Sequence, residues 1–220
     1  MRLPGFVDCR DLGRLERDLH RSEVLEQLVA LTNAASGPPR DTAAVLPNGV
    51  ELHQLEPHAD SRGVFTELFR DSWDLRVEPV QWNAVRSEAN VLRGVHAHWQ
   101  HADYLTVVVG RAAIGLHDLR EGSETEGAGD IVELDADSPA ALAIPPGVAH
   151  GFYFHEPSMH VYAVSHEWDP ADELGCRWDD PALEISWPCS EPLISGRDRE
   201  LGPLSALRDA WRAALAAAAH

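Results

Sequence analysis

The densest group of side chains able to bind a metal or move a proton lies between Arg93 and Asp103. His96 and His98 are two residues apart, and Asp103 follows five residues after His98. On a β-strand, side chains two residues apart lie on the same face. Two imidazoles on a buried face are costly unless they bind a ligand or form hydrogen bonds. The spacing therefore predicts a polar site built on a strand.

A second segment extends this spacing. Gly110 lies seven residues after Asp103, and further on His150 ends the run Pro145-Pro-Gly147-Val-Ala-His150. The combined pattern resembles the two motifs of the cupin superfamily of small β-barrels. In metal-binding cupins the corresponding residues hold a divalent ion. The resemblance therefore implies a divalent metal site at four positions, namely His96, His98, Asp103 and His150.

The elements that must position these residues are short strands. From about residue 45 to residue 188, runs rich in β-branched residues alternate with Gly and Pro turns, as in 106–120, 130–137, 141–147, 149–154 and 159–166. Many short strands with regular turn signals predict an all-β barrel or double-sheet jelly roll. The chain has no βα alternation, GxGxxG or GxxxxGK[ST], which argues against a Rossmann or P-loop fold.

The two ends of the chain have a helical pattern instead. Apolar residues recur at spacings of three and four within residues 1–35, and a breaker-rich stretch follows at 33–41. The Ala-rich segment 205–220 also favours a helix. We therefore predict three parts: a helical N-terminal arm and linker at 1–44, a cupin-type double-stranded β-helix at 45–198, and a helical C-terminal tail at 199–220.

Charge and composition narrow the function. The 220 residues include 36 acidic and 18 basic side chains, a net charge of −18, and every basic residue is Arg. A negative field repels nucleic acid, so we expect no nucleic-acid partner. Schiff-base chemistry is excluded because it requires Lys. We expect no membrane span, since no stretch approaches about 18 apolar residues. The charged, Pro-containing N-terminus is unlike a signal peptide and favours a cytoplasmic protein.

The three cysteines argue against two further kinds of structure. Cys9, Cys176 and Cys189 are widely separated and form no CxxC. This spacing argues against a disulfide scaffold and against a zinc site made of thiolates.

A closer resemblance covers residues 49–198. The matching stretches are Asp60–Glu67, Gln81–Asn83, Arg93–His96, Asp118–Gly127, Pro145–Phe152, Val161–Tyr162, Asp169–Glu173, Trp178–Pro181, Ile185–Pro188 and Pro192–Asp198. This ordered set resembles the dTDP-4-dehydrorhamnose 3,5-epimerase family, a branch of the cupins. The resemblance implies an isomerase that abstracts a proton beside the C4 ketone of a nucleotide-linked 4-keto-6-deoxy sugar, needs no cofactor and forms a homodimer.

The resemblance also implies roles for individual residues. His96 matches the catalytic base, Asp198 the carboxylate that orients it, and Tyr162 the proton donor. Arg93 is expected to bind the pyrophosphate, and Trp168 to stack on the nucleobase. The other substrate-binding positions are Arg62 and Glu67, which reach the nucleotide sugar across the dimer interface, and the pocket residues Gln81, Asn83 and His150.

Each of these roles has a simpler structural alternative. Arg62 and Glu67 could form an ion pair with each other. Tyr162 could be a core aromatic with its hydroxyl bonded, and Asp198 could be a solvated loop residue. For His101 and His117 we expect hydrogen-bonded core imidazoles.

One departure from the family pattern affects the chemistry. Seven residues before Gly110 the family usually carries a Lys that stabilises the enolate oxygen, and here Asp103 occupies that position. A divalent ion would restore the positive charge and polarise the ketone. His96, however, cannot be a metal ligand and a base at once. Either no metal binds at this set, or another group such as Tyr162 takes the proton. Alternatively, His98 and His101 pair with Asp103 and leave His96 free.

Two other functions remain open at this point. The HxH–Asp103–His150 spacing is also that of a metal-dependent cupin enzyme acting on another substrate. The missing Lys is also compatible with a barrel that binds a nucleotide sugar without catalysis.

Overall fold

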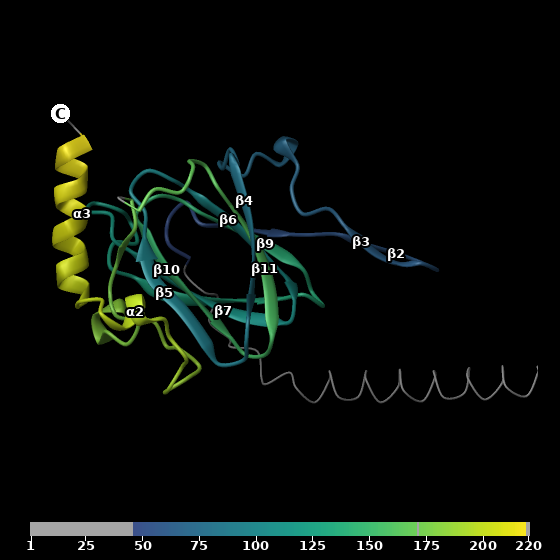
Figure 1. The fold of residues 1–220 in the computed structure, drawn as a ribbon. Coiled ribbons are helices and arrows are strands. Elements are labelled where there is room, and N and C mark those ends of the chain that lie inside the picture. The colour runs from purple at the N-terminus through teal and green to yellow at the C-terminus, as the bar shows by residue number, and fades with distance from the viewer. Residues whose placement is uncertain (1–45, 171, 219–220) are drawn as a thin grey trace, which may run out of the picture. The chain divides into compact units, whose positions relative to one another are not determined.

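The β-rich segment folds into two antiparallel sheets. The computed structural model describes residues 46–170 and 172–218, so the predicted N-terminal helical arm lies outside the described residues. The first sheet has the order β1-β9-β6-β11-β4 and the second the order β12-β5-β10-β7-β8. Figure 1 shows the two sheets stacked into one sandwich-like barrel. The predicted all-β jelly roll is confirmed.

The strands are short, as the turn spacing predicts. Their bounds are β1 Glu51–Gln54, β2 Pro57–Asp60, β3 Gly63–Thr66, β4 Gln81–Ser87, β5 Val91–Ala97, β6 Asp103–Val109, β7 Arg111–Asp118, β8 Gly129–Asp135, β9 Ala140–Ile144, β10 Val148–Phe154, β11 Ser158–Val164 and β12 Leu174–Gly175. Two 3-10 turns, η1 Asp71–Trp73 and η2 Pro181–Leu183, and two helices, α2 Gly196–Arg199 and α3 Leu204–Ala218, complete the described elements.

The main core lies between the two sheets. Leu105 and Val107 on β6 meet Ile114 and Leu116 on β7, and all four are buried. The spacing of two along each strand directs these side chains inward. The same core contains Leu142, Ile144 and Phe154 from neighbouring strands. Phe152 and Tyr162 pack against this core from the neighbouring strands β10 and β11.

The local backbone explains why the first sequence motif has a glycine at position 110. Gly110 joins β6 to β7 with a φ of +74°, a backbone conformation that L-residues rarely adopt. A Cβ at this position would lie 2.4 Å from Oγ of Ser158. Both facts require glycine in the turn, and the turn fixes the register of the strand that begins at Asp103.

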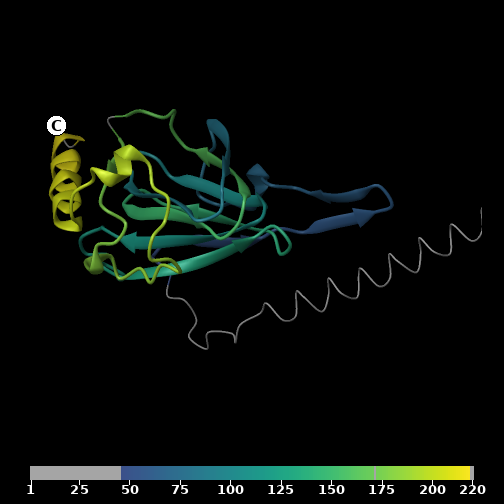
Figure 2. The ribbon, with the colours of Figure 1, turned by 60° about the horizontal axis from the view of Figure 1, so that its bottom comes forward.

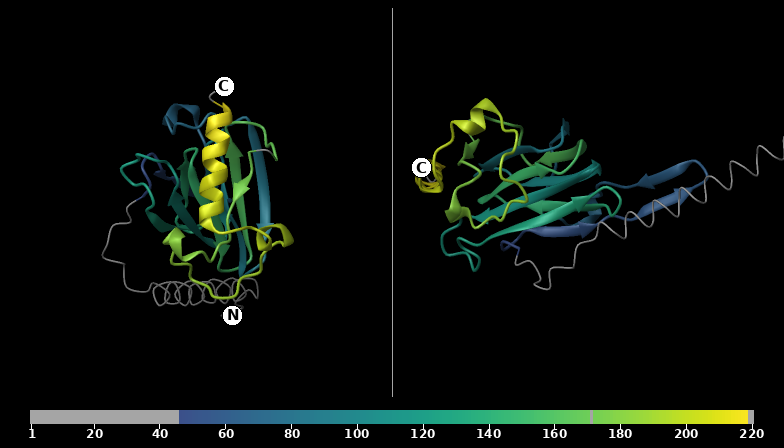
Figure 3. Two further views of the ribbon diagram at one scale, coloured as in Figure 1. Left: turned by 90° about the vertical axis from the view of Figure 1, so that its left-hand side faces the viewer. Right: turned by 90° about the horizontal axis from the view of Figure 1, so that it is seen from below.

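The C-terminal segment packs against the barrel through helix α3. Leu204, Leu207 and Trp211 follow a helical spacing of three and four and are buried. They share a core cluster with Val95 and Ala149 on β5 and β10. Figure 3 shows α3 lying across one end of the barrel. The predicted C-terminal helix is confirmed, and its docking fixes the position of the segment that precedes it.

The hairpin of β2 and β3 extends beyond both sheets. Figure 2 shows it projecting from the end of the barrel opposite α3. Its two strands pair only with each other among the described strands. Val64 and Phe65 on this hairpin are 67% and 62% exposed. Two neighbouring apolar side chains of this hairpin are thus left in solvent.

Candidate active site

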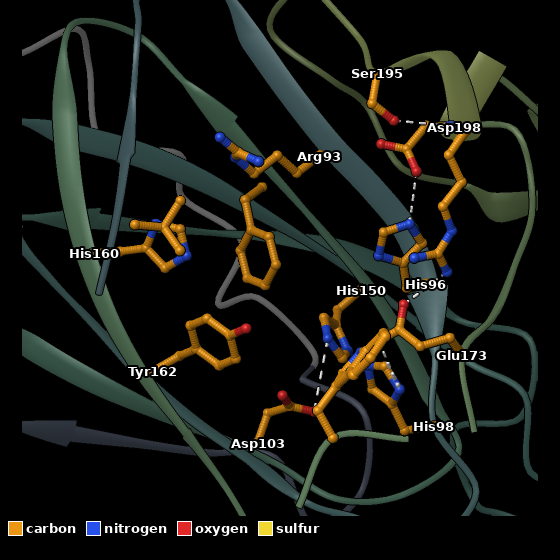
Figure 4. Close-up of a pocket in the computed structure, with 14 residues that line it drawn as sticks. Arg93, His96, His98, Asp103, His150, His160, Tyr162, Glu173, Ser195 and Asp198 are labelled. Carbon is orange, nitrogen blue, oxygen red and sulfur yellow. Dashed lines mark hydrogen bonds and ion pairs between the residues drawn. The ribbon is translucent and has the colours of Figure 1, made fainter. Parts of the chain in front are cut away.

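Polar side chains from both sheets converge on one pocket of about 300 Å³. Figure 4 shows their arrangement. The second sheet supplies β5 and β10, the first sheet supplies β4, β6 and β11, and two segments after β11 complete the wall. The lining residues are Val85, Arg93, His96, His98, Asp103, His150, Phe152, His160, Tyr162, Trp168, Glu173, Ser195, Arg197 and Asp198.

His96 and Asp198 form a hydrogen-bonded pair in this pocket. Nε2 of His96 lies 2.7 Å from Oδ1 of Asp198. Asp198 is 5% exposed, and so the alternative of a solvated loop residue is wrong. Burial alone would raise the pKa of Asp198, but the hydrogen bond and charge of His96, together with the contacts of Ser195 and Gly94, outweigh it, and the net pKa lies below the ordinary value. An ionised carboxylate accepts Nε2–H and leaves the lone pair on Nδ1 of the imidazole.

The backbone around Asp198 explains why the pair forms. Ser195 is the N-cap of α2, and its Oγ accepts a hydrogen bond of 3.0 Å from the Asp198 amide. Such a cap fixes the first turn of the helix. The other carboxylate oxygen accepts a long contact of 3.5 Å from the Gly94 amide on β5. The cap thus fixes the backbone of Asp198, and its two carboxylate oxygens contact His96 and Gly94 of the same strand.

Tyr162 enters the same pocket from β11. Its hydroxyl points toward the interior of the pocket (Figure 4). Burial raises its pKa, and the nearby carboxylates of Asp103 and Glu173 add to the effect. The phenol therefore stays protonated at neutral pH and is able to donate a proton.

Arg93 also lines the pocket, from the same strand β5 that carries His96. Its Nε donates a 3.0 Å hydrogen bond to Oγ of Ser87. Its Nη2 makes a 3.4 Å contact with the carbonyl of Arg86. These contacts hold the guanidinium at the pocket, where it is able to bind phosphate oxygens through two parallel N–H groups.

The predicted nucleotide-binding residues divide into two groups. Trp168 lines the pocket and is 51% exposed, and its amide donates a 2.9 Å hydrogen bond to Oε1 of Gln81. Nε2 of Gln81 in turn donates to Oδ1 of Asn83 at 3.1 Å. Gln81 and Asn83 thus stand behind the pocket wall. Arg62 and Glu67 do not line this pocket.

Arg62 and Glu67 also do not pair with each other. Arg62 binds Asp60 with Nη2 2.6 Å from Oδ2, and Glu67 binds Arg70 with Oε1 2.5 Å from Nη2. The alternative of an Arg62–Glu67 ion pair is therefore wrong. Both residues lie at or next to the β2–β3 hairpin, away from the pocket of their own chain.

The four residues of the cupin-like spacing all line the pocket, but they do not act as one set. His96 faces Asp198, whereas Nε2 of His150 lies 3.7 Å from Oδ2 of Asp103. His101, expected to be a core imidazole, also has its Nε2 3.7 Å from that oxygen. His117 is a hydrogen-bonded core residue, with Nδ1 2.9 Å from the carbonyl of Leu183.

Burial shifts the pKa values of Asp103, His98 and His150 in this pocket. Burial raises the pKa of Asp103 well above its ordinary value, and Glu173 and Asp172 add to the shift. Burial also lowers the pKa of His150 to about 4 and that of His98 further still. The imidazoles are therefore neutral at neutral pH, with lone pairs available to a ligand.

Comparison with known proteins identifies the family. The model of the dTDP-4-dehydrorhamnose 3,5-epimerase family matches residues 46–206. The dTDP-4-dehydrorhamnose 3,5-epimerase of Shigella flexneri is 33% identical over 158 residues, which cover 68% of this chain and 87% of that protein. The chain belongs to the dTDP-4-dehydrorhamnose 3,5-epimerase family. The spore coat polysaccharide biosynthesis protein SpsL of Bacillus subtilis is 35% identical over 144 residues, 64% of this chain and 95% of that protein.

Solved structures of epimerases share the fold. NovW, a 4-keto-6-deoxy sugar epimerase of Streptomyces spheroides, aligns with a TM-score of 0.71 and 32% identity over 80% of this chain and 95% of that chain. The RmlC epimerase of Legionella pneumophila, solved with dTDP-4-keto-L-rhamnose, aligns with a TM-score of 0.69 and 28% identity over 74% of this chain and 90% of that chain. The predicted family and the cupin-type fold are confirmed.

Sequence analysis assigned no role to six of the pocket residues, among them Arg197 and Glu173. Arg197 and Glu173 lie in the matched stretches, yet no role follows from their spacing. In the structure Nη2 of Arg197 lies 2.7 Å from Oε2 of Glu173, and both line the pocket. No pattern in the sequence pairs a loop residue after β11 with helix α2, because the contact depends on how the two segments cross.

Helices of the described part of the chain do not reach the length and apolarity needed to cross a bilayer.

Proposed function

We propose that this chain is an epimerase that inverts a carbon next to the C4 ketone of a dTDP-linked 4-keto-6-deoxy sugar. The observation that carries the proposal is the 2.7 Å hydrogen bond between His96 and Asp198 in the pocket that Tyr162 also lines. An epimerase needs a base on one face of the carbon and an acid on the other. Membership of an epimerase family supports the same reaction.

The proton transfers use groups of this chain alone. Nδ1 of His96 takes the proton beside the ketone, and the electron pair moves to the C4 oxygen to give an enolate. Asp198 stabilises the imidazolium that forms, as a carboxylate does in a His–Asp pair. Tyr162 then returns a proton to the opposite face. Solvent reprotonates Tyr162 and accepts the proton of His96, so the cycle needs no redox cofactor.

The remaining pocket residues bind the nucleotide. Arg93 binds the pyrophosphate, and Trp168 stacks on the base, with its backbone held by Gln81. His150 and Asn83 complete the pocket and its support. The support for a dTDP sugar is chemical and comparative: the Legionella relative was solved with such a ligand. We therefore expect dTDP to compete with the substrate.

Arg62 and Glu67 are proposed to serve the site of a second copy of the chain. They lie at the β2–β3 hairpin, whose exposed Val64 and Phe65 would be buried against that copy. A homodimer then explains both the apolar tip and the absence of these two residues from the pocket of their own chain. Light scattering of the full chain tests this, and Phe65→Ser is expected to give a monomer. A cytoplasmic location remains a prediction from the sequence.

Solvent deuterium exchange tests the reaction. The wild-type chain is incubated in D₂O with dTDP-4-keto-6-deoxyglucose, and mass spectrometry counts the deuterium at carbon. We expect incorporation by the wild type and loss of it in His96→Ala, with Asp209→Asn on the exposed face of α3 as a control. Folded wild type that binds dTDP without any exchange would instead identify a non-catalytic nucleotide-sugar-binding barrel and refute the epimerase.

A further inference from the structure

Three imidazoles and one carboxylate lie close together next to the His96–Asp198 pair. One ligand atom from each of His98, His101 and Asp103 lies within 4.8 Å of the other two, and all three residues are buried. His150 joins them from β10, with Nε2 3.7 Å from Oδ2 of Asp103. This cluster, His98–His101–Asp103–His150, differs from the spacing-based set by having His101 in place of His96.

Neighbouring groups orient two of the rings toward Asp103. Nδ1 of His101 lies 2.7 Å from Oδ2 of Asp172, and Nδ1 of His150 lies 3.1 Å from the carbonyl of Val148. Acceptors at these positions require Nδ1–H on each ring, and so each Nε2 carries a lone pair. A carboxylate or carbonyl behind a ligating histidine is the usual outer contact of metal sites.

The distances between the facing atoms are those of ligands and not those of hydrogen bonds. Oδ2 of Asp103 is 3.7 Å from Nε2 of both His101 and His150. Hydrogen bonds of this kind span about 2.7–3.2 Å. Two ligands bound to zinc at about 2.0–2.1 Å in a tetrahedron lie about 3.4 Å apart. The two 3.7 Å separations from Oδ2 of Asp103 are thus close to those of ligands that share one divalent ion.

His98 supplies an independent sign of a missing partner. It is 6% exposed and stacks on His101 with ring centroids 4.0 Å apart. Within residues 46–170 and 172–218, its buried Nδ1 has no hydrogen-bond partner, and the nearest carboxylate oxygen, of Glu173, is 3.8 Å away. Buried polar nitrogens without a partner are rare and call for an explanation such as an ion.

We propose that His98, His101, Asp103 and His150 bind one divalent first-row transition metal ion, such as zinc, at the base of the pocket. Three nitrogens and one carboxylate oxygen suit such an ion. His96 is not a ligand in this site, because its Nε2 is bonded to Asp198, and so it stays available as a base. This resolves the conflict between metal binding and base catalysis that the sequence pattern raises.

The site also accounts for the carboxylate of Asp103 next to a reaction that generates an enolate. An ionised Asp103 alone would repel the developing negative charge. A divalent ion bound to it makes the local charge positive, where it would polarise the C4 ketone. This role rests on the proposed function, whereas binding of the ion does not.

Metal content tests the site directly. The full chain, purified without chelator or nickel resin, is expected to contain about one transition metal ion per chain by elemental mass spectrometry. Chelator-stripped protein is then titrated with Zn²⁺ and with Co²⁺, whose visible absorption reports nitrogen and oxygen ligation. Stripped protein that keeps its circular dichroism yet binds neither ion at micromolar concentration would overturn the proposal.

Variants separate this ligand set from the spacing-based one. Asp103→Asn is expected to weaken Zn²⁺ binding at least about 100-fold, and Asp172→Asn, behind His101, about 10-fold to 100-fold. His160→Gln, a buried histidine of the same pocket outside the cluster, is the matched control and keeps full binding. His96→Ala also keeps it; loss of Zn²⁺ in this variant would replace our set with His96–His98–Asp103–His150. If Asp103→Asn fails to fold, the wild-type titration still decides.

The exchange assay distinguishes failure of the site from failure of the proposed function. Metal bound without any deuterium exchange leaves the site standing and refutes the epimerase. Exchange by stripped protein at the rate of loaded protein leaves the epimerase standing and refutes the polarising role of the ion.

Discussion

Nε2 of His96 lies 2.7 Å from Oδ1 of Asp198, although 102 positions separate the two residues in the chain. The histidine comes from a central strand, and the carboxylate comes from the first turn of a four-residue helix capped by Ser195. The pair is therefore assembled only when the C-terminal segment docks on the barrel. Substitution of either residue tests its role in the proton transfer.

Replacement of Asp198 by Asn is expected to lower the exchange rate about 100-fold to 10,000-fold, because the imidazole loses the carboxylate that sets its tautomer and stabilises its charge. The measurement is deuterium incorporation under single-turnover conditions. Ser195→Ala removes only the cap and is expected to cost less. An Asp198→Asn variant as fast as the wild type would show that His96 works without its partner.

Replacement of Tyr162 by Phe is expected to separate proton removal from inversion. His96 still abstracts the proton and exchanges it with solvent, but the opposite face lacks its acid. Product formation therefore falls about 100-fold or more, while deuterium still enters the recovered substrate. Mass spectrometry and NMR on one sample give both quantities. Parallel loss of the two would mean that Tyr162 is needed before proton removal.

Replacement of Arg93 by Ala is expected to weaken dTDP binding about 10-fold to 100-fold, since charge-assisted hydrogen bonds contribute about 1.5–3 kcal/mol. Arg93→Lys restores only part of the affinity, because an ammonium lacks the planar fork. Calorimetric titration measures both variants. Arg111→Ala on an exposed strand end is the control, and equal loss in this control would indicate a general charge effect.

Replacement of Asp118 by Asn is expected to destabilise the fold in a pH-dependent way. This buried carboxylate accepts hydrogen bonds from Arg120 at 2.8 Å, Ser123 at 2.6 Å and Thr125 at 2.7 Å. Burial alone would raise the pKa of Asp118, but these bonds outweigh it and lower the pKa below its ordinary 3.8. We expect a loss of about 2–3 kcal/mol at pH 7.

The sign of the pH effect follows from that lowered pKa. A carboxyl group with a depressed pKa in the folded state stabilises the protein above the unfolded pKa, and this contribution is lost as the pH falls toward the folded value. The difference between wild type and Asp118→Asn should therefore be constant between pH 5 and 7 and shrink below about pH 4. Urea unfolding at several pH values measures it; a difference that grows on acidification contradicts the assignment.

Replacement of Gly115 by Ala tests the packing behind the pocket. A Cβ at Gly115 would lie 2.5 Å from Cη2 of Trp187, so the indole must move. We expect a loss of about 1–3 kcal/mol and a shift of the tryptophan emission. Gly202→Ala, whose Cβ would be 3.5 Å from that of Ala206, is the matched control. Unchanged stability in Gly115→Ala would mean that the strand gives way instead.

The sequence predicts most of the barrel because strand patterns are local. The run rich in β-branched residues over 106–120 and the glycine inside it are visible without tertiary information, and the strands 103–109 and 111–118 form there. The Ala content of segment 205–220 likewise predicts helix α3. Ordered motif matches bring His96, Tyr162 and Asp198 to one pocket, since a shared fold preserves relative positions.

The details that the sequence does not predict depend on contacts between distant segments. His101 looks like a core histidine, but Asp172, 71 residues later, turns its ring toward Asp103. The pair of Glu173 and Arg197 depends on how a loop passes helix α2. The position of Arg62 depends on a hairpin that leaves the barrel. Spacing along the chain carries no information about such crossings.

The late position of Asp198 has a consequence for biosynthesis. The strands that line the pocket are all synthesised before Asp198, the group that aligns the imidazole. An intermediate that has folded only these strands therefore lacks the carboxylate partner of His96, and we expect exchange to begin only after the segment that carries Asp198 has docked on the barrel.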